Sequence, residues 1–471
     1  MYCKALVVVT LNLLAVSWGF MQGQMTGMIA ALQKKEDGID LSEAETALLG
    51  AFPNLFFMVG FFFLALISEK FGRRWCLIIV SVPLVINWII LYFAKTFVAL
   101  LLSRFLASVS SGPLWAMSAA GSSEYVSYKS RALCLSMVLM VVPSFGIGLG
   151  HALGVLFHWR TTALIGIVLS CVHVVLPYFW VESPHWLASK GRFEECEHVF
   201  RKLHGNKSSN EHELLLLIKL ETKKQKTANE MNANNTYRIL LQTFKKKYFW
   251  HLMIMCGVIY AYYAAAGRVI FTNLATVILE EMTGTSDVLL YTLVVDSFVL
   301  IGTCISCFLI KKMSIRALLF SSGLISNGIL IALSACLYFK NNEVYFQWIN
   351  VLLLALYFIV INAGPYPVMD VILGEMFPLE IKLYCYFLST PIMLSTVFLC
   401  LLMLPYIVSV IGYHGLFLLN SGIMFICLAY LYVRLPETKG KTLQEIEVYF
   451  KTNSFDVNPV LSPSEQIKTL I

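Results

Sequence analysis

Long apolar runs alternate with short polar segments along almost the whole chain. Each run has about the 20 residues that a helix needs to cross the hydrocarbon core of a bilayer. The runs lack the alternating polarity of barrel strands, and each span in lipid must satisfy its own backbone hydrogen bonds, which only a helix does. The pattern predicts twelve transmembrane helices, at about residues 5–29, 47–67, 75–94, 97–121, 132–156, 163–181, 249–279, 287–310, 317–339, 345–373, 383–411 and 415–434.

A charged segment interrupts this pattern between the sixth and seventh spans. It contains two stretches with helical apolar spacing, 192–204 and 211–225, which we expect to lie as short helices at the membrane surface. The predicted organisation therefore has four parts, which are a six-helix half (1–181), a linker (182–248), a second six-helix half (249–434) and a tail (435–471).

The composition agrees with a polytopic membrane protein. Hydrophobic residues make up 58% of the 471 residues and charged residues only 13%, against about 25% in an average soluble protein. These values exclude a secreted disulfide scaffold, a disordered chain and a nucleic-acid binder, despite a net charge of +7. Most of the twelve cysteines lie in apolar runs, and the pair Cys304 and Cys307 has neither a second pair nor polar surroundings. We expect no metal, no cofactor and no enzymatic activity.

The basic residues set the predicted orientation. With both termini in the cytoplasm, 28 of the 35 lysines and arginines fall on the cytoplasmic side and five fall outside. The positive-inside rule favours this topology.

The two halves carry the same polar landmarks at corresponding places. This recurrence predicts a duplicated six-helix unit, and two such halves with a midplane site between them form a transporter architecture. The paired landmarks are Glu69–Arg74 with Lys311–Arg316, Glu124 seven residues before Arg131 with Glu375 seven before Lys382, and Val181–Pro184 with Leu435–Thr438.

These motifs resemble those of the sugar porters of the major facilitator superfamily. Leu435–Leu443 reads like the family's PETKGKTL, Val181–Leu187 like its PESPRWL with two changes, and Glu69–Arg74 like its D-R-x-G-R-R with Glu for Asp. The general look is that of the insect facilitated trehalose and hexose transporters. The resemblance implies an all-α membrane protein with twelve transmembrane helices in two pseudo-symmetric halves.

The resemblance also implies a gate at the cytoplasmic ends of the spans, where charged residues form salt bridges between the halves. Exposed pairs contribute about 0–1 kcal/mol each, so several together would bias the carrier between its two states. The alternative is that the charges only anchor the topology. Gly72 permits a tight return between spans two and three. The gate residues are Glu69, Gly72, Arg73, Arg74, Arg104, Glu124, Arg131, Glu182, Glu375, Lys382 and Glu437.

Arg104 lies inside the fourth span, where a charge is costly and points to a function. In proton-coupled relatives a matching arginine partners an aspartate of the first span, and the matching place here is Met21. The missing acid favours a passive facilitator.

The sugar-binding positions of the family are mostly apolar here. The amide motif of span seven becomes Ala261–Gly267, the span-five glutamine falls at Leu139 or Met140, and the span-eleven pair becomes Met393–Leu394. Sugar hydroxyls need hydrogen-bond partners, so we expect other groups to supply them. The candidates are Asn362, Tyr366, Asp370, Tyr262 and Tyr263, with a loosened helix at Pro365 and Pro367.

Two further charges lie at similar depth in neighbouring spans. Arg268 and Asp296 are about 11 and 9 residues from the outer ends of spans seven and eight, so we expect them to pair in or near the cavity. The alternative is that each meets backbone carbonyls or snorkels separately. His151, His158 and His173 are interpreted as packing or interface residues.

Together these features predict passive, alternating-access transport of a hexose or trehalose. The alternatives are a carrier for another, charged solute and a non-transporting sugar sensor on the same scaffold. We expect a small-molecule solute and the lipid bilayer as partners, with no nucleic acid and no obligate protein partner, and a location in the plasma membrane.

Overall fold

The computed structural model describes residues 2–33, 39, 41–205, 208–230, 244–245, 247–267, 288–339, 344–377 and 382–456, and these are almost entirely helical. The N-terminal helices are α1 (Tyr2–Gln33), α2 (Glu43–Phe93), α3 (Phe97–Glu124), α4 (Tyr128–Ser136), α5 (Val142–Leu156) and α6 (Trp159–Val175). The linker forms α7 (Pro184–Ser189), α8 (Phe193–His204) and α9 (Ser208–Glu230). The C-terminal helices are α11 (Lys247–Ala265), α13 (Val288–Lys312), α14 (Ile315–Tyr338), α15 (Val344–Ala363), α16 (Pro365–Met376), α17 (Lys382–Arg434) and α18 (Leu443–Thr452).

Ten helical segments of the described residues are long and apolar enough to cross a membrane. Two of the predicted spans lie in the first parts of α2 and α17, which are long because each contains two helices joined at a glycine. Gly72 has a φ of 85° and Gly412 a φ of 68°, which are left-handed values that favour glycine. The predicted return at Gly72 is confirmed.

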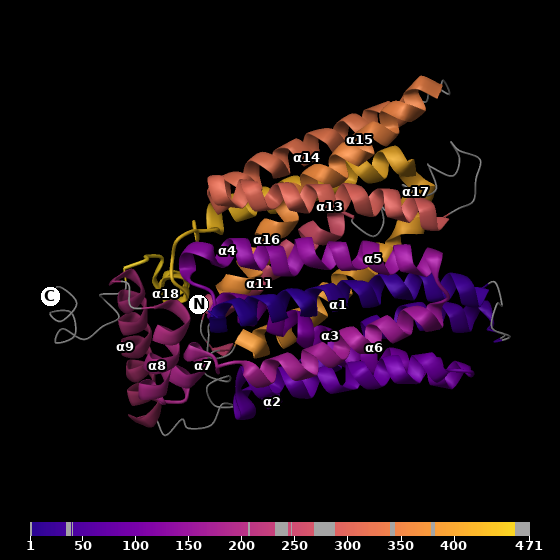
Figure 1. Cartoon of the computed structure of the whole chain (residues 1–471). Helices are drawn as coiled ribbons and strands as arrows, with labels where there is room; N and C mark the ends of the chain where they lie inside the picture. The colour runs from indigo at the N-terminus through magenta and orange to yellow at the C-terminus, as the bar shows by residue number, and fades with distance from the viewer. Residues whose placement is uncertain are drawn as a thin grey trace.

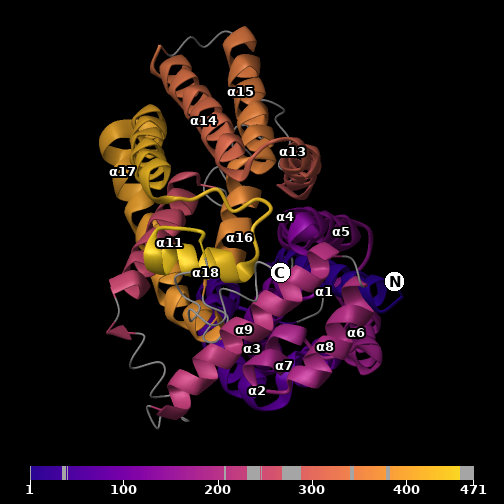
Figure 2. The same cartoon turned by 90° about the vertical axis from the view of Figure 1, so that its left-hand side faces the viewer.

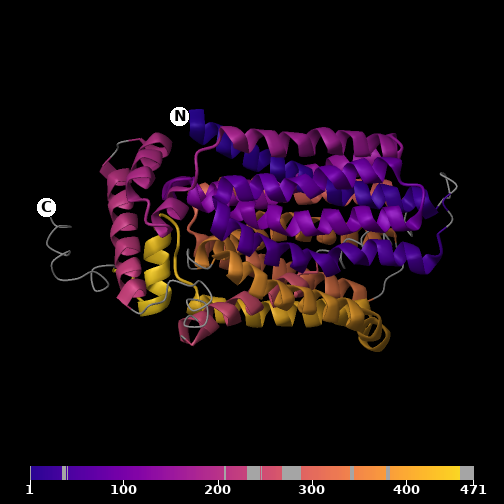
Figure 3. The same ribbon diagram turned by 90° about the horizontal axis from the view of Figure 1, so that it is seen from below.

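The helices form two groups that lie side by side (Figures 1 and 3). The N-terminal group, in indigo to magenta, meets the C-terminal group, in orange to yellow, where α5 packs against α13 and where α2 packs against α17. We call the end of the bundle that carries α7, α8, α9 and α18 the linker end, which faces the viewer in Figure 2, and the opposite end the far end.

The internal repeat reappears as matching contacts at the linker end. Glu182 accepts from the backbone nitrogen of Arg73 at 2.8 Å, and Arg74 donates to the carbonyl of Tyr178 at 2.6 Å. In the other half, Glu437 accepts from the backbone nitrogens of Ile315 and Arg316, and Arg316 donates to the carbonyl of Tyr432 at 2.8 Å. In both halves a carboxylate therefore binds the free backbone donors at a helix start.

The linker helices cover the linker end of the bundle. Their apolar faces form a small core of their own, separate from the main core. The 192–204 prediction matches α8 closely, and α9 buries Leu214 and Leu217 of the second predicted stretch. This core consists of Leu187, Ala188, Cys196, Phe200, Leu214 and Leu217.

Candidate functional site

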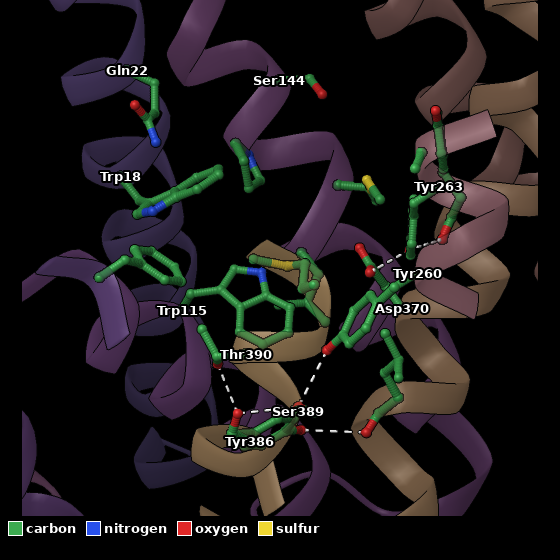
Figure 4. Close-up of a pocket in the computed structure, with 18 of the residues that line it drawn as sticks. Trp18, Gln22, Trp115, Ser144, Tyr260, Tyr263, Asp370, Tyr386, Ser389 and Thr390 are labelled. Atoms are coloured by element: carbon green, nitrogen blue, oxygen red, sulfur yellow. Dashed lines mark hydrogen bonds between the residues drawn. The ribbon is translucent and has the colours of Figure 1, made fainter. Parts of the chain in front are cut away.

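A cavity of about 500 Å³ lies between the two groups of helices (Figure 4). We call it the main cavity. Its volume is within the range of about 300–1,000 Å³ that is typical of small-molecule sites. Side chains from α1, α2, α3 and α5 form one wall, and side chains from α11, α16 and α17 form the other. The main cavity therefore lies where a rocking movement of the two groups would open it to either end.

An aspartate and two tyrosines form the polar centre of the C-terminal wall. The hydroxyl of Tyr263 donates to Oδ1 of Asp370 at 2.6 Å, and the rings of Tyr263 and Tyr366 stack with centroids 4.9 Å apart. Tyr366 and Asp370 begin α16 directly after the chain breaks at Gly364, as the prolines Pro365 and Pro367 predict. Because of this break, Tyr366 and Asp370 line the main cavity. In a continuous helix the same side chains would point in other directions.

Hydroxyl groups of α11 and α17 extend this wall. The Tyr260 hydroxyl lies 3.3 Å from Oγ of Ser389, and Thr390 donates to the carbonyl of Tyr386 at 2.7 Å (Figure 4). None of these four residues is among the sequence-based candidates. The available signal was their polarity within apolar spans, which does not reveal the direction in which a side chain points.

Tryptophan rings and two polar groups form the N-terminal wall. Trp18 and Gln22 project from α1, one turn apart, while Trp115 of α3 and Ser144 of α5 lie near them (Figure 4). Aromatic faces of this kind stack on sugar rings, and the amide and hydroxyl groups hydrogen-bond to sugar hydroxyls. None of these four residues is among the sequence-based candidates either.

The positions aligned with the family's amides do reach the main cavity. Leu139, Met140, Ala264 and Met393 all line it, so the alignment places the cavity correctly while the side chains there are apolar. Leu139 and Met140 belong to a π-helical turn, Met137–Val141, between α4 and α5. Such turns are rare and occur frequently at functional sites.

Two predicted binding residues lie away from the main cavity. Asn362 is fully buried and donates to the carbonyl of Phe358 at 2.8 Å, and Tyr262 is fully buried on α11; neither is among the residues that line the main cavity. A helix that is apolar on all sides does not indicate which face its polar residues occupy.

Asp296 pairs with a histidine of the other half. Its Oδ2 lies 2.5 Å from Nδ1 of His151, and Nε2 of His151 lies 3.2 Å from the hydroxyl of Thr26. The expected pair with Arg268 has its second member outside the described residues. Of the two roles considered for His151, packing and interface, this contact supports the interface, because it joins α5 to α13 near the far end.

Buried charges connect the helices at the linker end. Arg73 forms a bidentate contact with Glu124, at 3.0–3.2 Å, and Glu124 also accepts from the Ser183 hydroxyl at 2.6 Å. Both charged side chains are buried. The expectation of exposed pairs is wrong, because α7 and the loop before it cover this network.

Two basic residues link the halves at the same end. Lys382 of α17 donates to Oγ of Ser123 at 2.6 Å, and Arg131 of α4 donates to the Lys441 carbonyl at 3.2 Å. Arg131 also lies 3.6 Å from Glu213 of the linker. Both basic side chains are 1% exposed, so removal of either leaves buried groups without a partner.

Glu375 and Glu69 complete the predicted set. Glu375 of α16 is buried within electrostatic range of Arg131 and Lys382. The side chain of Glu69 lies outside the part that the structure describes.

Burial raises the pKa of Glu182 above its ordinary value, while the backbone donors of Ser183 and Arg73 oppose that increase.

Arg104 takes no part in this network. It is 1% exposed on α3, and its Nε and Nη2 have no hydrogen-bond partner among the described residues. Its side chain lines a second pocket of about 180 Å³, which we call the side pocket, together with Met21.

Comparisons with known proteins agree with this geometry. Residues 8–450 match the family model described as "Sugar (and other) transporter". The facilitated trehalose transporter Tret1 of Bombyx mori is 25% identical over 434 residues, covering 91% of this chain and 84% of the relative. The sugar transporter ERD6-like 6 of Arabidopsis thaliana is 25% identical over 449 residues, covering 93% of this chain and 88% of the relative.

Solved structures share the fold. The major facilitator proton:xylose symporter XylE bound to 6-bromo-6-deoxy-D-glucose has a TM-score of 0.78 at 18% identity, covering 95% of this chain and 99% of that chain. The inward-open conformation of XylE from E. coli has a TM-score of 0.61 at 17% identity, covering 94% and 99%. The twelve-helix fold of two pseudo-symmetric halves is therefore confirmed.

Proposed function

This chain belongs to the sugar (and other) transporter family, and on that basis we propose that it carries a hexose or trehalose across a membrane by facilitated diffusion. It is an integral membrane protein with the major facilitator fold. The relatives that it matches are transporters rather than enzymes.

The composition of the main cavity is the observation that carries this proposal. Asp370, Tyr260, Ser389 and Gln22 supply acceptors and donors from both halves, and Trp115 supplies a stacking surface. A bound sugar would pair its hydroxyls with these groups and rest its apolar ring face on the aromatic rings. These residues replace the amides that other members of the family carry at the aligned positions.

The first helix supports transport without ion coupling. Residues 2–33 include no Asp or Glu, and Met21 lines the side pocket at the place that corresponds to the acid of proton-coupled relatives. Without an acid at that place, no carboxyl group there can bind and release a proton as the carrier changes between its two states.

The linker end is the cytoplasmic end in this proposal, and the plasma membrane is the proposed location. Among the described residues, basic side chains that include Arg74, Arg131 and Lys382 lie at that end, which the positive-inside rule assigns to the cytoplasm. The gate is then formed by the network of Arg73, Glu124, Arg131, Glu375 and Lys382, which is intact when the cytoplasmic side is closed.

Uptake by proteoliposomes tests the proposal. Purified protein is reconstituted, and entry of labelled glucose and labelled trehalose is measured with and without a protonophore. We expect uptake of one of these sugars that does not change with the protonophore and is accelerated by unlabelled sugar inside the vesicles. Absence of uptake and exchange for every sugar, in protein that remains monodisperse, would contradict the proposal. Empty vesicles are the control.

A further inference from the structure

The side pocket contains a buried positive charge that the described residues leave unneutralised. An arginine side chain remains charged in proteins. In Arg104, Nε and Nη2 have no hydrogen-bond partner among the described residues, and the side chain is buried. The residue lies in a helix that crosses the membrane, about 10 Å from the far end of α3. A guanidinium in such a setting costs several kcal/mol unless an opposite charge or hydrogen-bond acceptors meet it.

The described residues that line the side pocket include no carboxylate. Besides Arg104, the donors in the lining are the indole of Trp18 and the amide of Gln22. The hydroxyls of Ser108 and Ser111 donate to backbone carbonyls of α3, and the remaining lining groups are apolar. The Trp18 indole nitrogen also has no hydrogen-bond partner within the described part of the chain. Several donors therefore border a space that lacks a negative charge.

The side pocket adjoins the main cavity. Trp18, Gln22, Phe57 and Met393 line both, and Figure 4 shows Trp18 and Gln22 together at one side of the main cavity. At about 180 Å³ the side pocket is smaller than the range of volumes typical of small-molecule sites. A group held there would lie beside a solute in the main cavity.

We infer that Arg104 binds a small monovalent anion in the side pocket, either the carboxylate of a sugar acid that occupies the main cavity or a free inorganic anion such as chloride. This inference rests on the proposed function, in which the main cavity holds a sugar, and deepens it by naming either a sugar acid in place of a neutral sugar or an inorganic anion beside the sugar. A guanidinium binds a carboxylate through two parallel hydrogen bonds, which suits its two unpaired nitrogens. Chloride would accept from the same donors.

Iodide provides a direct probe, because Trp18 lines the side pocket and iodide quenches indole fluorescence. The full chain is purified in detergent with a bulky sulfonate as the only buffer anion, and sodium iodide is titrated. We expect a saturable quenching component in the wild type that chloride or glucuronate displaces. Arg104→Gln should weaken that component by about tenfold or more. Arg160→Gln is the matched control, since Arg160 stacks on Trp159 near the far end and does not line the side pocket.

Glucose, glucuronate and chloride distinguish the two sources. If glucuronate displaces iodide at least about tenfold better than glucose does, and only when Arg104 is present, the anion is the carboxylate of the solute. If chloride displaces iodide and accelerates glucose uptake while glucuronate is no better than glucose, the anion is inorganic.

Non-saturable quenching that is the same in the wild type and in Arg104→Gln would overturn the inference. That result would leave the proposed sugar transport standing, because glucose uptake is measured separately. If Arg104→Gln does not fold, Arg104→Lys takes its place, because it keeps the charge but loses the two-bond geometry. Displacement of iodide from the wild type by chloride or glucuronate also tests the inference without any variant. Sugar uptake that fails while iodide binding persists would instead contradict the proposed function.

Discussion

At the scale of single residues, the main cavity uses side chains that short motifs do not identify. Asp370 is the acidic group in its lining, and Tyr263 orients that carboxylate. His185 has a different importance, since it is buried at the linker end between the acidic Glu124 and the basic Arg131 and Lys382.

Asp370→Asn should weaken sugar binding. The amide keeps the shape of the carboxylate but loses its charge, and a hydrogen bond to a charged group contributes about 1.5–3 kcal/mol. We expect the KM of transport to rise by about tenfold or more with little change in the maximal rate. Initial uptake rates in proteoliposomes measure this, with Asp456→Asn in the exposed tail as the control. An unchanged KM would remove Asp370 from the binding site.

His185 should make the protein less stable in acid. Burial lowers the pKa of His185 from 6.5 to about 4, while the nearby Glu124 opposes that decrease. The unfolded chain therefore takes up this proton below pH 6.5 and the folded protein only below about 4, so the stabilisation is complete above 6.5 and disappears as the pH falls from 6.5 to 4. The loss is up to about 3 kcal/mol.

Thermal unfolding across this pH range checks the effect of His185. The wild type should lose more stability between pH 6.5 and 4 than His185→Gln, while His198→Gln, at an exposed position of α8, should follow the wild type. Parallel curves for the wild type and His185→Gln would show that the histidine is not buried in neutral form.

At the scale of elements, local breaks position the functional groups. Gly72 reverses the chain within α2, Gly364 separates α15 from α16, and the π-helical turn precedes α5. The turn at Gly72 also has no room for a side chain, because a Cβ there would lie 2.4 Å from Oε2 of Glu182. That carboxylate binds the backbone of Arg73 and so fixes the next helix.

Gly72→Ala should destabilise the protein more than a glycine substitution in open space. Gly440 has a similar φ of 77°, and no atom lies within 4 Å of the place that its Cβ would take, so Gly440→Ala adds only the backbone cost of about 1 kcal/mol. Gly72→Ala adds the displacement of Glu182, about 1–2 kcal/mol more. Apparent Tm values in detergent compare the two variants. Equal losses would show that Glu182 moves aside freely.

At the scale of the whole molecule, opposite ends of the bundle hold different contacts between the halves. Arg131 and Lys382 connect the halves at the linker end, and His151 with Asp296 connects them near the far end. Because the main cavity lies between these ends, breaking one set of contacts should favour the state that opens at that end.

Cys400 reports which end is open, since its thiol lines the main cavity. Arg131→Ala should increase its labelling by an impermeant maleimide applied from the linker end, and His151→Ala should increase labelling from the far end. We expect changes of about 5- to 20-fold, corresponding to about 1–2 kcal/mol. Mass spectrometry locates the label on Cys400.

Two exposed neighbours are the controls for this experiment. Lys129 lies near Arg131 on α4, and Ser297 lies next to Asp296 on α13. Neither Lys129→Ala nor Ser297→Ala should change the labelling. Arg131→Ala without any increase from the linker end would mean that these charges only anchor the topology.

The sequence by itself determined the spans, the repeat and a few of the positions that line the main cavity. Apolar length is a local property, and the motifs at Glu182 and Glu437 recur at corresponding places in the two halves, so both can be predicted without a tertiary structure. The alignment of Leu139 and Met393 with binding positions also agrees with the cavity lining.

Only the tertiary structure decided which polar groups meet. His151 and Asp296 are 145 residues apart, and Gln22 and Ser389 face one cavity from opposite halves. A helix that is apolar all round gives no sign of which face meets lipid, another helix or the solute. The burial of Arg73 and Glu124 likewise depends on the linker segments that cover them, and the unpaired nitrogens of Arg104 are evident only once the neighbouring described helices are in place.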